Sequence, residues 1–235
     1  MSEALPARNL NGSVQLWDDK TNVLSDHGGV AVTIDGQAGI RATTNSTGDY
    51  VFGNLPYGTY TLSFTKEGIG TYRLFGLRHT DGTAPGDSSS LPRVVQLGKQ
   101  STTSITSFTL AGNTYAGDST QTDGSGVTFR ATISPAPSSA SRAYIRHFLS
   151  TEPTVSSTNY TYASPLTALL SNNALSGFSK NALLKAGFKA GQTVYVRAYG
   201  DSFQSNQYVD PETGLRRFPN VNATSPPALS FVVPN

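Results

Sequence analysis

The residue types that could support catalysis are few in this chain of 235 residues. The three histidines, His27, His79 and His147, lie far apart, and none belongs to an H-x-x-x-H pair that could hold a metal ion. We expect His27 and His79 to lie in loops and His147 in a strand. The sequence has no G-x-S-x-G motif that would present a nucleophilic serine. It also has no cysteine, which excludes thiolate metal sites and a cysteine nucleophile. We therefore predict no catalytic residues and no enzyme activity.

Short acidic and glycine-rich segments could hold a cation or a phosphate. Asp18-Asp19 and the pair Asp81 and Asp87 place carboxylates at the short spacing that calcium requires. The EF-hand pattern is absent, however, and aspartate is common in turns because its side chain bonds the nearby backbone. Gly68–Gly70 is followed by no Lys-Ser or Lys-Thr, so it is not a phosphate loop. We predict no metal site and no cofactor.

One segment, residues 208–222, combines residues that could bind a ligand. Its DPETG sequence, 210–214, predicts a hairpin turn. The hairpin would present four candidate ligand-binding residues: Tyr208, Arg216, Arg217 and Phe218. Aromatic faces flanked by arginine suit stacking on a sugar ring or contact with an acidic partner. The alternative is a surface loop whose aromatic side chains fold back onto the core.

The charge content argues against nucleic acid as a partner. Charged residues make up 14% of the chain, where an average globular protein has about a quarter. The formal net charge is +2, and Arg216-Arg217 is the densest basic pair, so no basic surface is predicted. No apolar run approaches the roughly 20 residues that a membrane-spanning helix needs. We predict no nucleic-acid partner and no transmembrane segment.

Alternation of apolar and polar residues predicts short strands throughout the chain. In the first half, the apolar positions are Val30, Val32 and Ile34, and then Tyr60, Leu62 and Phe64. In the second half, they are Val127, Phe129, Ala131 and Ile133, and then Val194, Val196 and Ala198. With 23 glycines and 13 prolines to form turns, the sequence predicts an all-β fold of two tandem antiparallel β-sandwich domains.

Changes in composition along the chain predict the domain boundaries. Residues 1–12 are polar and predict a flexible N-terminus, after which 13–111 form the first sandwich. Its last strand is predicted at Thr102–Leu110, where the apolar alternation slips between Ile105 and Phe108 and predicts a bulge. Residues 112–126 are rich in Gly, Ser, Thr and Asp and contain only one large apolar side chain, Tyr115, which predicts a linker. The second sandwich is predicted over 127–235.

The first half contains an extended motif, T-x-x-x-G-x-Y-x-F-x-x-L-P-x-G-x-Y-x-L, over Thr44–Leu62. With the preceding strand at Val30–Ile34, it resembles the carboxypeptidase regulatory-like domain, a β-sandwich of the transthyretin type. The resemblance covers about residues 13–110. It implies a non-catalytic attachment or binding module on an exported protein.

The second half resembles a fibronectin type III or related immunoglobulin-like sandwich. The residues that carry this resemblance are Gly191, Thr193, Tyr195, Val196, Arg197 and Ala198, and residues 208–222 would be an insertion. Such paired modules resemble surface proteins of Bacteroidetes-type bacteria, which are often lipid-anchored. The resemblance implies an extracellular or outer-membrane location. Because the first residues, Met1–Ala4, do not resemble an export signal, we expect a longer precursor with a leader that could carry a lipid anchor.

These observations leave more than one function open. The leading hypothesis is a non-enzymatic exported or cell-surface module for binding or structural spacing, with a surface partner or a glycan that the sequence does not identify. One alternative is a carbohydrate-binding accessory protein of a glycan-uptake system. Another is an accessory part of a secreted hydrolase, and a third is an enzyme whose motifs are not recognisable.

Overall fold

The predicted all-β class is confirmed by the structure, a computed structural model that describes residues 6–81, 94–115, 117 and 124–235. Regular structure in these ranges is almost entirely β-strand, and the helix α1 (Lys180–Lys185) is one short exception. Ser179 caps this helix, because its hydroxyl accepts a hydrogen bond of 3.1 Å from the Ala182 N–H.

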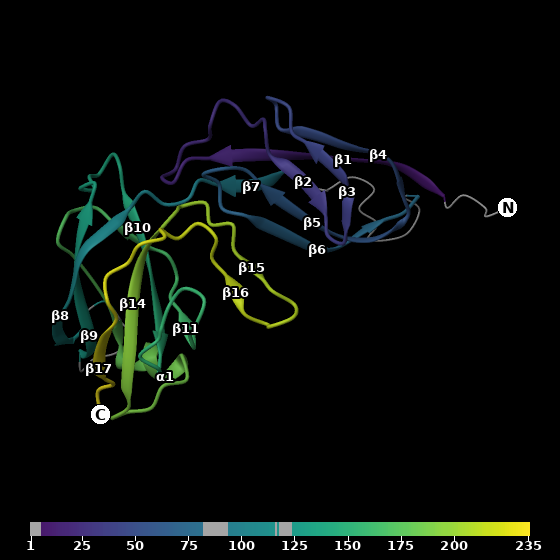
Figure 1. Cartoon of the computed structure of the whole chain (residues 1–235). Helices are drawn as coiled ribbons and strands as arrows, with labels where there is room; N and C mark the ends of the chain where they lie inside the picture. The colour runs from purple at the N-terminus through teal and green to yellow at the C-terminus, as the bar shows by residue number, and fades with distance from the viewer. Residues whose placement is uncertain (1–5, 82–93, 116, 118–123) are drawn as a thin grey trace. The chain divides into compact units, whose positions relative to one another are not determined.

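The chain forms two compact units, and each is discontinuous in sequence. The first unit consists of Met1–Gln100 and Gln204–Asn220. The second consists of Ser101–Phe203 and Val221–Asn235. The segment Gln204–Asn220 therefore belongs to the first unit, although it follows most of the second unit along the chain (Figure 1).

The first unit contains two sheets and a separate hairpin. One sheet has the order β4-β1-β7, formed by β1 (Ala7–Trp17), β4 (Asp49–Pro56) and β7 (Val95–Gly98). The other has the order β3-β2-β5-β6, formed by β2 (Ala31–Ile34), β3 (Gln37–Thr43), β5 (Gly58–Thr65) and β6 (Tyr72–His79). The hairpin pairs β15 (Tyr208–Val209) with β16 (Arg216–Arg217). The β1–β7 pair is parallel, and the other strand pairs described in this unit are antiparallel.

The core of the first unit follows the predicted alternation. Val30, Val32 and Leu62 are fully buried, and Phe64 packs edge-on against Tyr50, with ring centroids 6.0 Å apart. Burial of one face of each strand is the main stabilising contribution to a sandwich of this kind. The residues of the Thr44–Leu62 motif thus include core side chains as well as turn positions.

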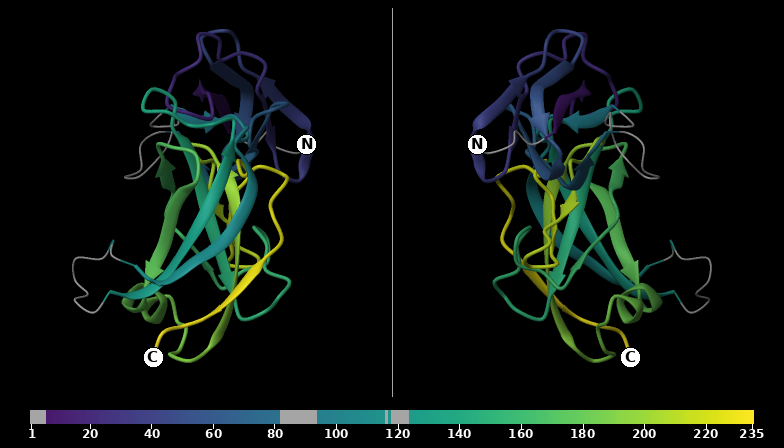
Figure 2. Two further views of the ribbon diagram at one scale, coloured as in Figure 1. Left: turned by 90° about the vertical axis from the view of Figure 1, so that its left-hand side faces the viewer. Right: turned by 90° about the vertical axis from the view of Figure 1, so that its right-hand side faces the viewer.

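The second unit is also built from two sheets (Figure 2). One contains β10 (Ala143–Ser150), β11 (Tyr162–Ala163), β12 (Thr167–Leu169), β14 (Thr193–Asp201) and β17 (Leu229–Val232). The other has the order β13-β9-β8, formed by β8 (Ser104–Thr114), β9 (Ser125–Ser134) and β13 (Ala174–Ser179). Apolar side chains from both sheets form one buried cluster, which includes Phe129, Ile145 and Val196.

Strand β10 is buried along its whole length. Ile145 and Leu149 belong to the core cluster, whereas Arg146 lies on the other face and forms an ion pair with Asp201, with Nε and Oδ2 2.7 Å apart. Arg146 also donates to the Ser164 carbonyl at 2.6 Å. Burial raises the pKa of Asp201 even though the Arg146 charge opposes that shift.

Described residues at both ends of the segment that we predict to be a linker, 112–126, belong to two paired strands. Strand β8 continues to Thr114, and β9 begins at Ser125 and pairs with it. Residues 116 and 118–123 lie outside the described residues. The structure places the boundary between the two units at Gln100 and Ser101 instead. Thr102–Leu110, predicted to close the first sandwich, therefore belong to the second unit. A Gly- and Ser-rich composition suits a hairpin loop as well as a linker, so composition alone does not separate the two.

Two further predictions differ from the structure. The predicted flexible segment 1–12 includes the start of β1, where Leu10 is fully buried and pairs with Phe52, while residues 1–5 lie outside the described residues. His79, predicted to lie in a loop, ends β6 and is fully buried. Both errors have the same cause. Each strand continues past the residues whose apolar alternation predicted it, because its backbone pairs with a strand that is distant in the sequence.

Replacing Gly48 by alanine is expected to destabilise the first unit by about 2 to 3 kcal/mol. Gly48 has a φ of +91°, and a Cβ there would lie 2.0 Å from the Val14 carbonyl oxygen. Gly36 has a φ of +75° with nothing within 4 Å of such a Cβ, so Gly36→Ala isolates the conformational cost alone, about 1 kcal/mol. Equal losses for the two variants in urea unfolding would contradict the steric argument.

Candidate functional site

The candidate site lies on the hairpin β15–β16, which forms as predicted from its sequence. The Asp210 N–H donates to the Leu215 carbonyl at 3.0 Å, and the Gly214 N–H donates to the Asp210 carbonyl at 2.8 Å. Gly214 has a φ of +66°, a conformation that glycine adopts without steric cost. The Asp210 carboxylate accepts from the Glu212 N–H at 3.0 Å. These bonds fix the turn and the spacing of the two short strands.

Two buried asparagines hold the base of the hairpin within the first unit. The Asn206 carboxamide oxygen accepts from the Gly98 N–H at 2.7 Å, and its nitrogen donates to the Gly70 carbonyl. Asn220 donates to the carbonyls of Gly98 at 2.7 Å and Lys99 at 3.1 Å. The two asparagines are also joined, because the Asn206 N–H donates to Asn220 Oδ1 at 2.5 Å. The hairpin is therefore a fixed part of this unit.

The four predicted ligand-binding residues have different environments. Tyr208 is half-buried, Arg216 is exposed, and Arg217 forms an ion pair of 3.1 Å with Asp210. Phe218 is only 6% exposed, so its ring is not open to a ligand. Tyr208 contacts other aromatic side chains. Phe218 instead fits the alternative prediction, a surface loop whose aromatic side chains fold back onto the core.

Tyr208 belongs to a group of three aromatic side chains that we call the aromatic platform: Tyr72, Phe75 and Tyr208. The Tyr208 ring lies 6.4 Å from the Tyr72 ring and 5.9 Å from the Phe75 ring, between centroids. Arg73 lies over Phe75, with its Cζ 4.7 Å from the ring centroid. Platform residues come from β6 and β15, which are separated by more than a hundred residues of chain.

A bulge in β6 accompanies the platform. Leu74 and Leu77 pair with Leu62 and Tyr60, so Phe75 and Gly76 together face the single residue Thr61. Gly76 has a positive φ, +69°, a conformation that glycine adopts without steric cost. A bulge turns the side chains of its strand away from regular alternation, which is why periodicity did not single out Phe75.

Charged groups beside the platform are held in place. Arg73 forms an ion pair with Asp35, and the Ser63 hydroxyl donates to Asp35 at 2.7 Å. Partial burial alone would raise the pKa of Asp35, but the hydrogen bonds from Ser63 and Arg73 and the Arg73 charge outweigh it and lower the pKa. The surface thus presents aromatic rings next to a fixed cation and a fixed carboxylate, the groups that bind the faces and hydroxyls of a sugar or a polar peptide.

The histidine that lies near a serine is not placed for catalysis. His147 Nε2 lies 3.0 Å from the Ser176 hydroxyl, and the imidazole is 1% exposed among Phe108, Phe129 and Phe178. Ser176 itself is 7% exposed, at a core-facing position of β13. A nucleophile must reach its substrate, so this pair functions as a core hydrogen bond in the geometry shown.

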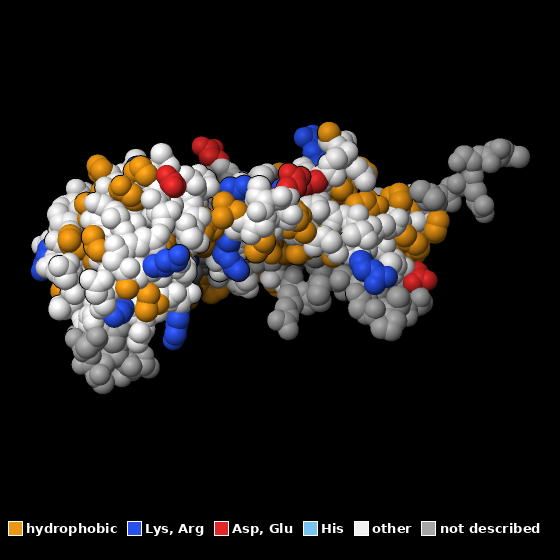
Figure 3. Space-filling model, turned by 90° about the horizontal axis from the view of Figure 1, so that it is seen from below, with side chains coloured by type: hydrophobic (Ala, Val, Ile, Leu, Met, Phe, Trp, Pro, Cys, Tyr) orange, Lys and Arg blue, Asp and Glu red, His pale blue; other side chains and the backbone are white. Residues whose placement is uncertain are grey.

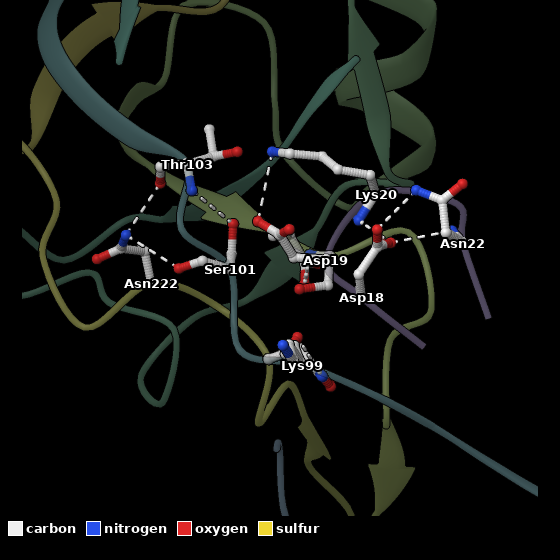
Figure 4. A network of polar contacts seen from close by, with 11 residues as sticks. Asp18, Asp19, Lys20, Asn22, Lys99, Ser101, Thr103 and Asn222 are labelled. Atoms are coloured by element: carbon white, nitrogen blue, oxygen red, sulfur yellow. Dashed lines mark hydrogen bonds and ion pairs between the residues drawn. The ribbon is translucent and has the colours of Figure 1, made fainter. Parts of the chain in front are cut away.

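Two of the carboxylates considered for calcium, those of Asp18 and Asp19, bind protein groups. Asp18 accepts from the Lys20 N–H at 2.8 Å and from both the backbone and side chain of Asn22, and Asp19 forms an ion pair with Lys20 (Figure 4). Asp87 lies outside the described residues. Within the described part of the chain, no group of three His, Cys, Asp or Glu residues could hold a metal ion.

Figure 3 shows Lys, Arg, Asp and Glu side chains scattered among uncharged ones on the face in view, with no continuous basic area among the residues described there. No helix in the described ranges is long and apolar enough to cross a membrane.

Comparison with known proteins assigns no family. No protein-family model matches the chain, and no curated protein has a significant match to it. A solved structure of a DUF3823 family protein from Parabacteroides merdae is 13% identical over 97% of this chain and 100% of that one, with a TM-score of 0.31. A Bacteroides uniformis protein that is provisionally described as carbohydrate-binding is 12% identical over 97% and 99%, with a TM-score of 0.32.

A cohesin–X-dockerin complex from Acetivibrio cellulolyticus also shows similarity, at 20% identity and a TM-score of 0.31. That match spans 40% of this chain and 59% of the other. TM-scores near this value are too low to assign a function.

Proposed function

We propose that this protein is a non-enzymatic, exported binding module whose ligand contacts the aromatic platform on β6 and β15. The observation that carries the proposal is the placement of Tyr208 against Phe75, with Arg73 over the Phe75 ring. Aromatic side chains held on a rigid scaffold lose little conformational entropy when a ligand binds. The asparagine bonds at the base of the hairpin supply that rigidity.

A carbohydrate is the ligand class that this chemistry favours. A sugar ring has apolar C–H faces that pack on aromatic rings, and its hydroxyls both donate and accept hydrogen bonds. The guanidinium of Arg73 can donate and the Asp35 carboxylate can accept, and both lie beside the rings. These groups support a role as a carbohydrate-binding accessory protein of a glycan-uptake system. An accessory part of a secreted hydrolase would bind its glycan at the same surface.

We expect Tyr208→Ala and Phe75→Ala each to weaken glycan binding by about tenfold or more, because each removes a ring that packs on the ligand. A glycan array identifies the ligand of the parent protein, and calorimetric titration then measures each variant. Tyr195→Ala removes a half-buried ring from β14 of the second unit and should leave binding unchanged.

Two results would count against this proposal. If no glycan bound to the parent protein, the carbohydrate would be excluded and a protein partner would remain for the same surface. If Tyr208→Ala and Phe75→Ala bound as tightly as Tyr195→Ala, the platform would not be the binding site. Thermal unfolding of each variant separates a lost contact from a lost fold.

The domain type of each unit and the location of the protein are also proposed. We assign the first unit to the carboxypeptidase regulatory-like type and the second to the fibronectin type III-like type, which the buried positions of Tyr50, Phe52 and Val196 support. An extracellular or outer-membrane location, with an exported and lipidated precursor, is consistent with that assignment. Fractionation of cells that express the full precursor, with and without protease treatment of intact cells, tests this location.

A further inference from the structure

A second concave surface lies on the outer side of the sheet β13-β9-β8 in the second unit. It is a half-open pocket of about 490 Å³, within the range of small-molecule sites. The lining residues that matter most are Tyr115, Thr128, Arg130, Leu175 and Gly177. None of these belongs to the aromatic platform, so the pocket is a separate feature.

Strand alternation and glycine create this pocket. On β9, Thr128 and Arg130 alternate with the core residues Phe129 and Ala131, and therefore point away from the core. Gly177 on β13 leaves room for an aromatic ring, because a Cβ there would lie 2.9 Å from Cδ2 of Tyr115. The Tyr115 ring thus rests over bare backbone and forms one wall.

An exposed apolar side chain and hydroxyl groups complete the lining. Leu175 is 55% exposed, and it lines the same pocket as Tyr115. The Thr128 hydroxyl donates to the Thr114 carbonyl and fixes the edge of the pocket. The pocket therefore offers apolar contacts and hydrogen-bonding groups together.

Arg130 gives the pocket its charge. It is the only charged residue among the described residues that line the pocket. Its Nη1 donates to the Asn173 carbonyl at a long distance of 3.4 Å. A guanidinium has five N–H donors and pairs with a carboxylate through two parallel hydrogen bonds, and no acidic side chain in the lining competes for them.

We propose that this pocket binds an acidic sugar, a uronic acid unit whose carboxylate pairs with Arg130 and whose ring packs on Tyr115 and Leu175. The positive charge favours acidic over neutral sugars, because only a carboxylate forms an ion pair with the guanidinium through two parallel charge-assisted hydrogen bonds. The pocket is a site independent of the aromatic platform, and the proposal does not depend on the function given above.

The test is calorimetric titration of the whole protein with galacturonic acid oligomers and with the matching neutral galactose oligomers. The parent protein should bind the acidic oligomer at least about tenfold more tightly than the neutral one. Arg130→Gln should remove that preference, and Tyr115→Ala should weaken binding of both oligomers. Arg142→Gln removes an exposed arginine elsewhere in the second unit and serves as the matched control.

Several outcomes would overturn the proposal. The acidic oligomer could fail to bind the parent protein, or it could bind equally well to Arg130→Gln. A loss of binding in Tyr208→Ala, together with full binding in Arg130→Gln, would move the ligand to the platform. Conversely, if Arg130→Gln loses binding of the acidic oligomer and Tyr208→Ala keeps it, the pocket is the binding site, whether or not the aromatic platform binds a glycan. Because Arg130 and Arg142 are both exposed, thermal unfolding should be unchanged in either variant.

Discussion

Replacing Asn220 by alanine is expected to lower the unfolding free energy of the first unit by about 3 to 5 kcal/mol. The side chain is fully buried, and it bonds three backbone groups: the carbonyls of Gly98 and Lys99 and the N–H of Asn206. Alanine leaves the buried Asn206 N–H without this partner, whereas the Gly98 carbonyl keeps the bond of 3.2 Å from the Gly70 N–H. An unsatisfied buried group such as this N–H costs about 1 to 3 kcal/mol, and the two lost hydrogen bonds to carbonyls add to it, so the total exceeds the effect of most single substitutions.

Urea unfolding of the whole chain, followed by a probe in the first unit, measures this loss. Trp17, which is the only tryptophan and lies on β1, supplies a fluorescence signal. Asn113→Ala removes an exposed asparagine of the second unit and should change stability by less than about 0.5 kcal/mol. The variant pair Asn206→Ala and Asn220→Ala should be non-additive, because the two side chains share one network.

The same bonds determine how the chain can be divided. A fragment of residues 1–100 lacks Asn206 and Asn220, so it should be far less stable than the first unit in the intact protein. A cut at Gly117 would not separate the units, because β8 and β9 on either side of it are paired in the second unit. A stable, cooperatively unfolding 1–100 fragment would show that the insertion does not stabilise this unit.

Alternation along the sequence predicted the strands because half-buried strands place every second side chain in the core. Val30, Val32 and Ile34 all proved buried, as did Val127 and Phe129. The predicted bulge in Thr102–Leu110 is confirmed, since the register of β8 shifts between Ile105 and Ser107. Such patterns are local, and each is imposed by the two-residue repeat of the strand itself.

The domain boundary and the site depend instead on contacts between distant residues. Nothing in the local sequence of Asn206 or Asn220 indicates that their partners lie near Gly70 and Gly98. The hairpin that carries Tyr208 was predictable from its turn, but the rings that it joins, on β6, were not. A polar stretch with a single tyrosine has the same composition whether it links domains or turns a hairpin, which explains the misplaced boundary.

The buried histidine should make the second unit less stable in acid. The pKa of His147 is lowered from 6.5 to about 4, mainly by burial among aromatic rings and to a smaller extent by the charge of Arg146. The folded state therefore keeps the imidazole neutral, whereas the unfolded chain takes up a proton below pH 6.5. His147 contributes full stability above pH 6.5, and that contribution falls by about 3 kcal/mol as the pH drops to 4. Below the folded-state pKa no further loss comes from this group.

A double variant tests this without leaving an unpaired hydroxyl. His147→Leu with Ser176→Ala replaces the hydrogen-bonded pair of 3.0 Å by apolar side chains, and its stability should lose the pH dependence assigned to His147. Ser176→Ala alone retains the imidazole and should retain the dependence. Asp201 acts in the opposite direction, since its raised pKa favours the folded state as pH falls, but it is present in all three proteins. Urea unfolding at pH 7, 5.5 and 4 gives the comparison, and an unchanged slope in the double variant would assign the acid sensitivity to other groups.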